Sequence, residues 1–106
     1  MIEMNQALFE KNVHGQEQPV LVEFWAPWCV YCRRITPALK RIAEQYRDKL
    51  LVGQVNIDNE PVLAGSEQIE VVPTLILYKN GQALGSIVAP ESKARIEEFI
   101  AEAIGA

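Results

Sequence analysis

Cys29 and Cys32, the only two cysteines of the chain, form a Cys-x-x-Cys pair. A disulfide between them would close a ring too small to add much loop-closure stability, so the spacing favours a chemical role over a structural one. If Cys29 lies at a helix N-terminus, unpaired backbone N–H groups and the helix dipole stabilise its thiolate and lower its pKa. That thiolate attacks a substrate disulfide, and Cys32, one turn along, then attacks the mixed disulfide. The pair therefore predicts two-electron thiol–disulfide exchange.

The hydrophobic pattern around this pair predicts the helix start that the chemistry needs. Residues 20–25 form an almost continuous apolar run, which is typical of a strand covered on both faces. From Cys29 to about residue 49, apolar residues recur at helical spacing, and Pro37 inside this helix is expected to kink it. The two cysteines are therefore expected at a strand-to-helix junction.

The rest of the chain also alternates between helical and strand patterns. We expect helices at residues 5–13 with Asn5 as the N-cap, 61 to about 68 and 92–104, strands at 50–57, 74–78 and 82–88, and at most a brief strand at 1–4. Asn80-Gly81 between two apolar runs is a hairpin signal, because both residues accept positive φ. The order predicts an α/β fold with a central mixed sheet of four or five strands and helices on both faces.

Length and charge limit the class of protein. The 106 residues predict a single domain, residues 1–106. With 10 basic and 14 acidic residues and no basic run, the chain is a poor candidate for binding nucleic acid or an anionic membrane. No apolar stretch is long enough to span a bilayer, and the first residues lack the pattern of a signal peptide. We therefore expect a cytoplasmic protein, and a monomer.

The segment of residues 22–32, Val-Glu-Phe-Trp-Ala-Pro-Trp-Cys-Val-Tyr-Cys, resembles the active-site segment of the thioredoxin family. The similarity continues outside it. Pro37 matches the kink proline of the family's active-site helix, and residues 55–58 match the end of the following strand. Residues 72–74, Val-Pro-Thr, match the cis-proline loop, and residues 79–81 match the hairpin. The resemblance covers almost the whole chain, from about residue 2 to the end.

This resemblance implies a thioredoxin-like fold and the reduction of disulfides in protein substrates. Cys29 is implied as the nucleophile and Cys32 as the resolving cysteine, and the two form a redox disulfide. Pro73 is implied to follow a cis peptide bond and to face the Cys29 sulfur, while the backbone of Val72 pairs with an extended substrate. Trp28 is implied as a wall of the substrate groove. No bound cofactor is implied, and electrons are expected from a partner of the thioredoxin reductase type.

Several positions near the cysteines depart from the family's usual residues. Val30 and Tyr31 lie where most thioredoxins have Gly-Pro, a dipeptide that influences the redox potential. The Tyr31 phenol either donates to the Cys29 thiolate and makes the protein more oxidising, or restricts which substrates dock, or has no redox effect. Ala89 replaces a glycine beside the substrate groove, and Val71 stands where glycine or serine is more usual. Both larger side chains are expected to alter the choice of partner.

Glu23 interrupts the apolar run of residues 20–25. A buried carboxylate is costly without a role or a partner, and many thioredoxins have an aspartate at this position. We expect Glu23 to accept a proton from Cys32, through water, with its pKa raised by desolvation. Gln54 replaces the family's usual lysine, which should make Glu23 easier to protonate. The alternative is a solvated carboxylate at a sheet edge.

Three other functions stay open from the sequence. The protein could act as a thiol oxidant or disulfide isomerase, or as a binding module with little redox turnover. It could also carry a metal as a dimer with two Cys-x-x-Cys pairs, because zinc usually takes four ligands. The only histidine, His14, lies in a polar connector far along the chain from the cysteines. We therefore expect no metal site within one chain.

Overall fold

The computed structural model describes residues 1–15 and 17–105. Within them, strands β1 (Ile2–Glu3), β2 (Val20–Trp25), β3 (Leu51–Asn56), β4 (Thr74–Lys79) and β5 (Gln82–Val88) form one sheet in the order β1-β3-β2-β4-β5. Strands β1, β3 and β2 run parallel to one another, whereas β4 is antiparallel to β2 and β5 is antiparallel to β4. The expected mixed sheet is therefore confirmed, with the continuous apolar strand β2 paired on both sides.

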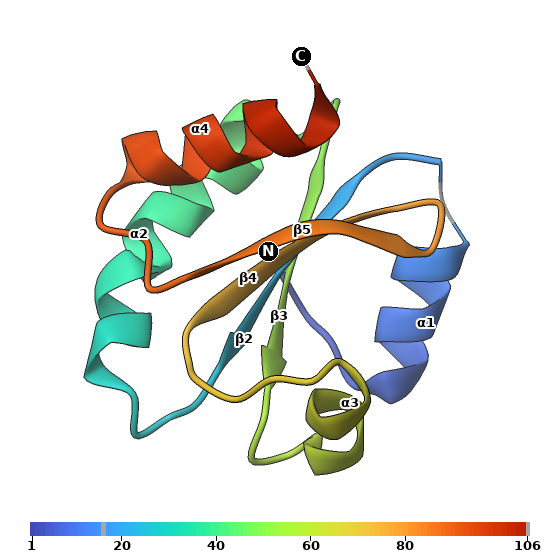
Figure 1. Cartoon of the computed structure of the whole chain (residues 1–106), viewed down its shortest axis with the longest axis vertical. Helices are drawn as coiled ribbons and strands as arrows, with labels where there is room; N and C mark the ends of the chain where they lie inside the picture. The colour runs from blue at the N-terminus through green and yellow to red at the C-terminus, as the bar shows by residue number, and fades with distance from the viewer. Residues whose placement is uncertain (16, 106) are drawn as a thin grey trace.

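Four helices cover the two faces of this sheet (Figure 1): α1 (Gln6–His14), α2 (Val30–Gln45), α3 (Pro61–Ser66) and α4 (Lys93–Ile104). α2 and α4 pack on one face, where their apolar residues meet Leu21, Val52, Leu75 and Leu77 of the sheet. α1 and α3 pack on the other, against Val20, Val22, Phe24, Val55 and Ile76. Because successive side chains of a strand point to opposite faces, β2 contributes to both cores.

Asn5 caps α1 as expected, and Ser92 caps α4. Asn5 accepts a hydrogen bond from the Leu8 N–H at 2.8 Å, and Ser92 accepts one from the Arg95 N–H at 3.1 Å. In both cases the side-chain oxygen satisfies an N–H that has no partner within the helix. The Asn80-Gly81 turn joins β4 to β5 with positive φ values of 53° and 80°, as expected.

Two helices end earlier than the sequence indicates. α2 ends at Gln45 rather than near residue 49, because the Lys49 and Leu50 N–H groups turn back to the Tyr46 carbonyl, both at 2.7 Å. α3 ends at Ser66 rather than residue 68, where Gln68 adopts a positive φ of 58°. Local apolar spacing continues through such turns and does not mark them. In residues 1–15 and 17–105, no helix combines the length and apolarity needed to cross a bilayer.

Candidate active site

Cys29 and Cys32 are joined by a disulfide at the start of α2, as expected. Cys29 is the N-cap residue, and its sulfur accepts a hydrogen bond from the Cys32 N–H at 3.1 Å. The Cys29 residue is 8% exposed and Cys32 is 1% exposed. The first cysteine is therefore the more accessible of the two, and its sulfur lies where the helix leaves its N–H groups without partners.

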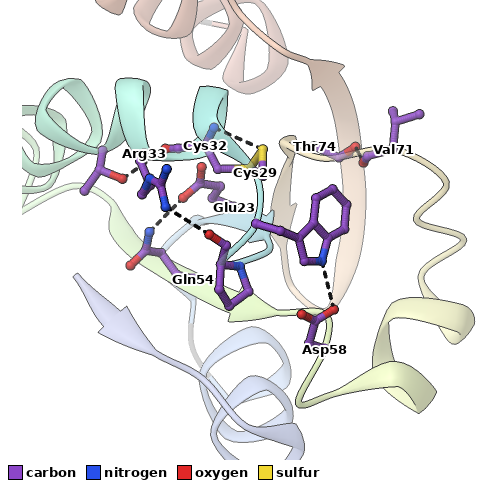
Figure 2. Close-up of a disulfide and its surroundings, with 11 residues drawn as sticks. Glu23, Cys29, Cys32, Arg33, Gln54, Asp58, Val71 and Thr74 are labelled. Carbon is purple, nitrogen blue, oxygen red and sulfur yellow. Dashed lines mark hydrogen bonds between the residues drawn. A yellow bond between two sulfur atoms is a disulfide. The ribbon is translucent and has the colours of Figure 1, made fainter.

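The turn between β2 and α2 fixes this sulfur in place. The Cys29 N–H donates to the Ala26 carbonyl at 3.1 Å, and Ala26 is completely buried. From the first turn of α2, the Arg33 guanidinium donates to the Pro27 carbonyl at 3.1 Å (Figure 2). Both hydrogen bonds join the segment between β2 and α2 to the start of the helix. The turn that carries Cys29 is therefore tied to α2 by its own backbone carbonyls.

Trp28 forms an exposed wall beside the disulfide, with 65% of its surface accessible. Its indole N–H donates to the Asp58 carboxylate at 3.3 Å, which orients the ring (Figure 2). Asp58 belongs to the segment that matches the family in sequence, but its contact with Trp28 was not predicted. The two residues lie 30 positions apart, so no local pattern could indicate the pairing.

The loop before β4 lies on another side of the disulfide. The Val72–Pro73 peptide bond is cis, which confirms the expectation from the resemblance. Val72 packs against the small cluster that contains both cysteines. The Pro73 carbonyl accepts a hydrogen bond from the Ala89 N–H at 2.9 Å, which brings Ala89 beside the loop. Ala89 has a positive φ of 45°, a conformation that suits glycine better than alanine.

The two residues between the cysteines differ in their surroundings. Val30 is 54% exposed and contributes an apolar side chain to the surface beside the disulfide. Tyr31 is half-buried, and its hydroxyl donates to the Pro90 carbonyl at 2.7 Å. In this structure the phenol therefore binds the loop before α4 and does not donate to a sulfur.

Glu23 is completely buried, so the alternative of a solvated carboxylate is wrong. It lies on the α2 side of the sheet, because it alternates with Val22 and Phe24, which pack on the α1 side. Gln54 is its partner across β2 and β3 and donates its amide to Glu23 Oε1 at 2.7 Å (Figure 2). The other oxygen, Oε2, has no hydrogen-bond partner among the described residues. Only one of the two carboxylate oxygens of Glu23 therefore has a hydrogen-bond partner among the described residues.

Desolvation raises the pKa of Glu23 from 4.5 to about 7, as the sequence led us to expect. The hydrogen bond from Gln54 opposes this rise, and the negative charge of Glu3 adds to it. Glu3 lies opposite Gln54 on the other side of β3, so the three side chains follow one row across the sheet. The carboxylate of Glu3 also accepts a hydrogen bond from the Trp25 indole at 3.4 Å. No pattern in the sequence indicated this role of Glu3.

No three histidine, cysteine or acidic side chains in residues 1–15 and 17–105 come together in a group that could hold a metal ion. The site consists of the disulfide, the Trp28 wall, the cis-proline loop and the buried Glu23. Of the residues that the sequence predicted around the cysteines, Tyr31 and Val72 pack against the cluster that contains both sulfurs. Residues from β2, α2 and the loop before β4 meet at one end of the sheet.

The thioredoxin family model matches residues 1–102 of this chain. The chain belongs to the thioredoxin family. It is 34% identical over 98 residues to "Thioredoxin" of Porphyra purpurea, covering 92% of each chain. It is 39% identical over 93 residues to "Thioredoxin 1" of Synechococcus elongatus, covering 88% of this chain and 87% of the relative. A "Bifunctional thioredoxin reductase/thioredoxin" of Mycobacterium leprae is 35% identical over 103 residues, covering 97% of this chain and 22% of the relative.

Membership in the thioredoxin family and the Cys29–Cys32 disulfide give the same conclusion. This thioredoxin-family protein is a thiol–disulfide oxidoreductase with a thioredoxin-like α/β fold. Its dithiol form gives two electrons to a disulfide and becomes the disulfide form described above.

Proposed function

We propose that this protein reduces disulfides in other proteins, with Cys29 as the nucleophile and Cys32 as the resolving cysteine. The observation that carries the proposal is the position of Cys29 as the N-cap of α2, with its sulfur accepting the Cys32 N–H at 3.1 Å. In the reduced protein, the same N–H group and the helix N-terminus favour a thiolate over a thiol. The greater exposure of Cys29 gives it first access to a substrate.

The reaction proceeds in two exchanges. The Cys29 thiolate attacks one sulfur of the substrate disulfide, so that a mixed disulfide forms and the other substrate sulfur leaves as a thiolate. Cys32 then loses its proton and attacks the Cys29 sulfur. This step closes the Cys29–Cys32 disulfide and releases the second substrate sulfur as a thiolate. The substrate gains two electrons, and its two thiolates take up protons according to their pKa values.

Glu23 is the group that accepts the Cys32 proton in this proposal. It is completely buried beneath α2, its pKa is raised to about 7 by desolvation, and its Oε2 atom has no partner among the described residues. A carboxylate with a pKa near neutrality is suited to take up and return a proton. Because Oε1 is occupied by Gln54, the second oxygen is the one free to receive it, through water.

Substrates dock over the disulfide against residues from three segments. Trp28 and Val30 are the exposed sequence neighbours of Cys29, and Val72 packs against the cluster that contains both cysteines. The backbone of Val72 is proposed to pair with an extended substrate chain, in the manner of strand addition. Tyr31 and Ala89 are proposed to border the same surface, and Pro73, whose carbonyl accepts the Ala89 N–H, is proposed to face the Cys29 sulfur.

A reductase of the thioredoxin reductase type is the proposed electron donor. The relative from Mycobacterium leprae, whose name combines a thioredoxin reductase with a thioredoxin, supports this partner. We further propose that the chain works as a single domain and as a monomer in the cytoplasm, where such reductases keep thiols reduced. Electron transport from reductase to protein substrate would then be its role in redox homeostasis.

The proposal is tested with insulin reduction by the wild type, Cys29→Ser and Cys32→Ser. We expect both variants to lose turnover. Cys32→Ser should accumulate a mixed disulfide through Cys29, visible as an added mass on non-reducing analysis, whereas Cys29→Ser should not. Turnover that survives in Cys29→Ser would contradict the mechanism. A reduction potential well above that of thioredoxins, about −270 mV, would instead indicate an oxidant or isomerase.

A further inference from the structure

Positive charge gathers on the helix that carries the cysteines. Residues 30–47 hold five of the ten basic residues of the chain but only one of its 14 acidic residues. The rest of the chain is therefore strongly acidic, and the formal net charge is −4. We call the four exposed basic residues of α2, together with Arg47 in the turn that follows the helix, the basic face of α2: Arg33, Arg34, Lys40, Arg41 and Arg47.

These residues point away from the protein core. Arg33 and Lys40 are seven positions apart, as are Arg34 and Arg41, so each pair lies in a row along the helix, about two turns apart. The side of α2 that faces the sheet is formed by buried apolar residues, Ile35, Leu39 and Ile42. Of the described elements, α4 lies beside α2 on the same face of the sheet, and none lies over the outer side of α2 (Figure 1).

The basic face is not used for ion pairing within the protein. In the described part of the chain, the ion pairs all lie on α4, where Lys93 and Arg95 contact glutamates. Arg33 uses its guanidinium to hold the Pro27 carbonyl beside the disulfide, which places the start of the face at the active site (Figure 2). The remaining four cations are left to solvent and are available to a partner.

Two surface hollows adjoin the middle of this face. One of about 500 Å³ lies between α2 and α4 and is lined by Lys40, Arg41, Glu44, Gln45 and Lys93. The other, of about 390 Å³, is lined by Met1, Lys40, Ala43, Glu44 and Arg47. Lys40 and Glu44 border both hollows. In each hollow the cations outnumber this one carboxylate, so the net charge that meets an incoming acidic side chain is positive. Both hollows are shallow and open to solvent, so the acidic side chains of a partner can reach the cations that line them.

We propose that the basic face of α2 docks an acidic segment of the protein whose disulfide Cys29 reduces. The inference rests on the proposed function and adds the class of its preferred substrate. Complementary charge speeds the encounter of two proteins and orients them before the exchange. A short acidic peptide segment fits the face, whereas a long nucleic acid would meet the negative charge of the rest of the molecule.

The geometry also sets where the acidic segment must lie. Lys40 follows Cys29 by 11 positions, which is about 16 Å along a helix. An extended peptide covers about 3.4 Å per residue, so the acidic segment should begin about five residues from the substrate cysteine. Acidic residues placed directly beside that cysteine would reach Arg33 but not the hollows around Lys40.

The test uses disulfide-containing peptides that differ only in one four-residue segment, placed five residues from a cysteine. One peptide carries Asp and Glu there, a second carries Asn and Gln, and a third carries the acidic segment directly beside the cysteine. The reduced protein is mixed with each peptide, and the second-order rate constant of disulfide exchange is measured. Lys40→Gln/Arg41→Gln removes two charges from the face. Lys11→Gln/Lys79→Gln removes two exposed charges elsewhere and is the matched control.

We expect the wild type to react about tenfold faster with the first peptide than with the other two at low salt. The preference should disappear in Lys40→Gln/Arg41→Gln and at about 0.5 M salt, but persist in the control variant. Equal rates for the first two peptides in the wild type, or equal preference in both variants, would overturn the inference. So would competition by a short DNA strand as strong as that of the acidic peptide.

Hydroxyethyl disulfide, a small neutral substrate, separates this inference from the proposed function. Its rate should be the same in the wild type and both variants. If the wild type does not react with it or with any peptide, the proposed function fails. The docking inference is then decided by a binding experiment. A form of the acidic peptide with serine in place of cysteine is added to the protein, and the backbone amide NMR signals of α2 are followed. Shifts at Lys40 and Arg41 support it, and their absence overturns it.

Discussion

Gln54 donates its side-chain amide to the buried carboxylate of Glu23 at 2.7 Å, across the parallel pair β2 and β3. A neutral amide satisfies one carboxylate oxygen but supplies no positive charge to stabilise the ionised form. Desolvation therefore prevails, and the pKa of Glu23 rises to about 7. Stability and the resolving step should both depend on this single contact.

Glu23 should make the stability of the oxidised protein depend on pH. Its pKa is about 7 in the folded state and near 4.5 in the unfolded state. Between these pH values the folded protein therefore binds more protons than the unfolded protein does. The free energy of unfolding therefore decreases as pH rises from 4.5 to 8, by about 3 kcal/mol from this group. Glu23→Gln should remove this part of the decrease, measured by urea denaturation at several pH values. The control variant Glu44→Gln, at an exposed position, should retain the decrease. Identical pH profiles of stability for Glu23→Gln and the wild type would contradict the raised pKa of Glu23.

Substitutions of Gln54 should move the pKa of Glu23 in opposite directions. Gln54→Lys places an ammonium group beside the carboxylate and should lower the pKa by roughly one pH unit. Gln54→Leu removes the hydrogen bond that favours the ionised form and should raise it. The carboxyl carbon signal of Glu23, followed by NMR over pH, reports both changes. Shifts in the same direction would show that Gln54 acts through packing and not through charge and hydrogen bonding.

Ala89→Gly should stabilise the protein by about 0.5–1 kcal/mol. The positive φ of Ala89, 45°, brings its Cβ too close to the backbone, and glycine has no Cβ. The N–H of residue 89 that donates to the Pro73 carbonyl at 2.9 Å is retained in the variant. Urea denaturation of the oxidised form measures the gain. Ala83→Gly, in strand β5, is the control and should destabilise by a similar amount.

Tyr31→Phe separates the structural role of the phenol from a redox role. The variant loses the hydrogen bond to the Pro90 carbonyl, and we expect a loss of about 1 kcal/mol in the free energy of unfolding. The reduction potential should change by less than about 15 mV, which for a two-electron couple corresponds to about 0.7 kcal/mol. Equilibration with glutathione measures it. A larger rise or fall would mean that the hydroxyl contacts a sulfur in the reduced protein.

Local sequence patterns determined the elements and the position of the chemistry. The apolar run of β2 followed by helical spacing predicted the junction at which Cys29 caps α2, and Asn80-Gly81 predicted the turn of the hairpin. The resemblance around Val72-Pro73 predicted the cis bond. These features depend on neighbouring residues, whose conformational preferences act over a few positions and are visible in the sequence.

Only the tertiary structure decided the contacts between distant segments. The hydroxyl of Tyr31 reaches Pro90, the indole of Trp28 reaches Asp58, and Glu3 joins the row of Gln54 and Glu23. Such contacts depend on strand register and on how helices pack against the sheet, which the spacing of apolar residues does not specify. The basic face of α2 also depends on the folded structure. Its five cations are scattered among residues 33–47. The coiling of α2 places the four that lie within the helix on its outer side, and Arg47 lies in the turn that follows.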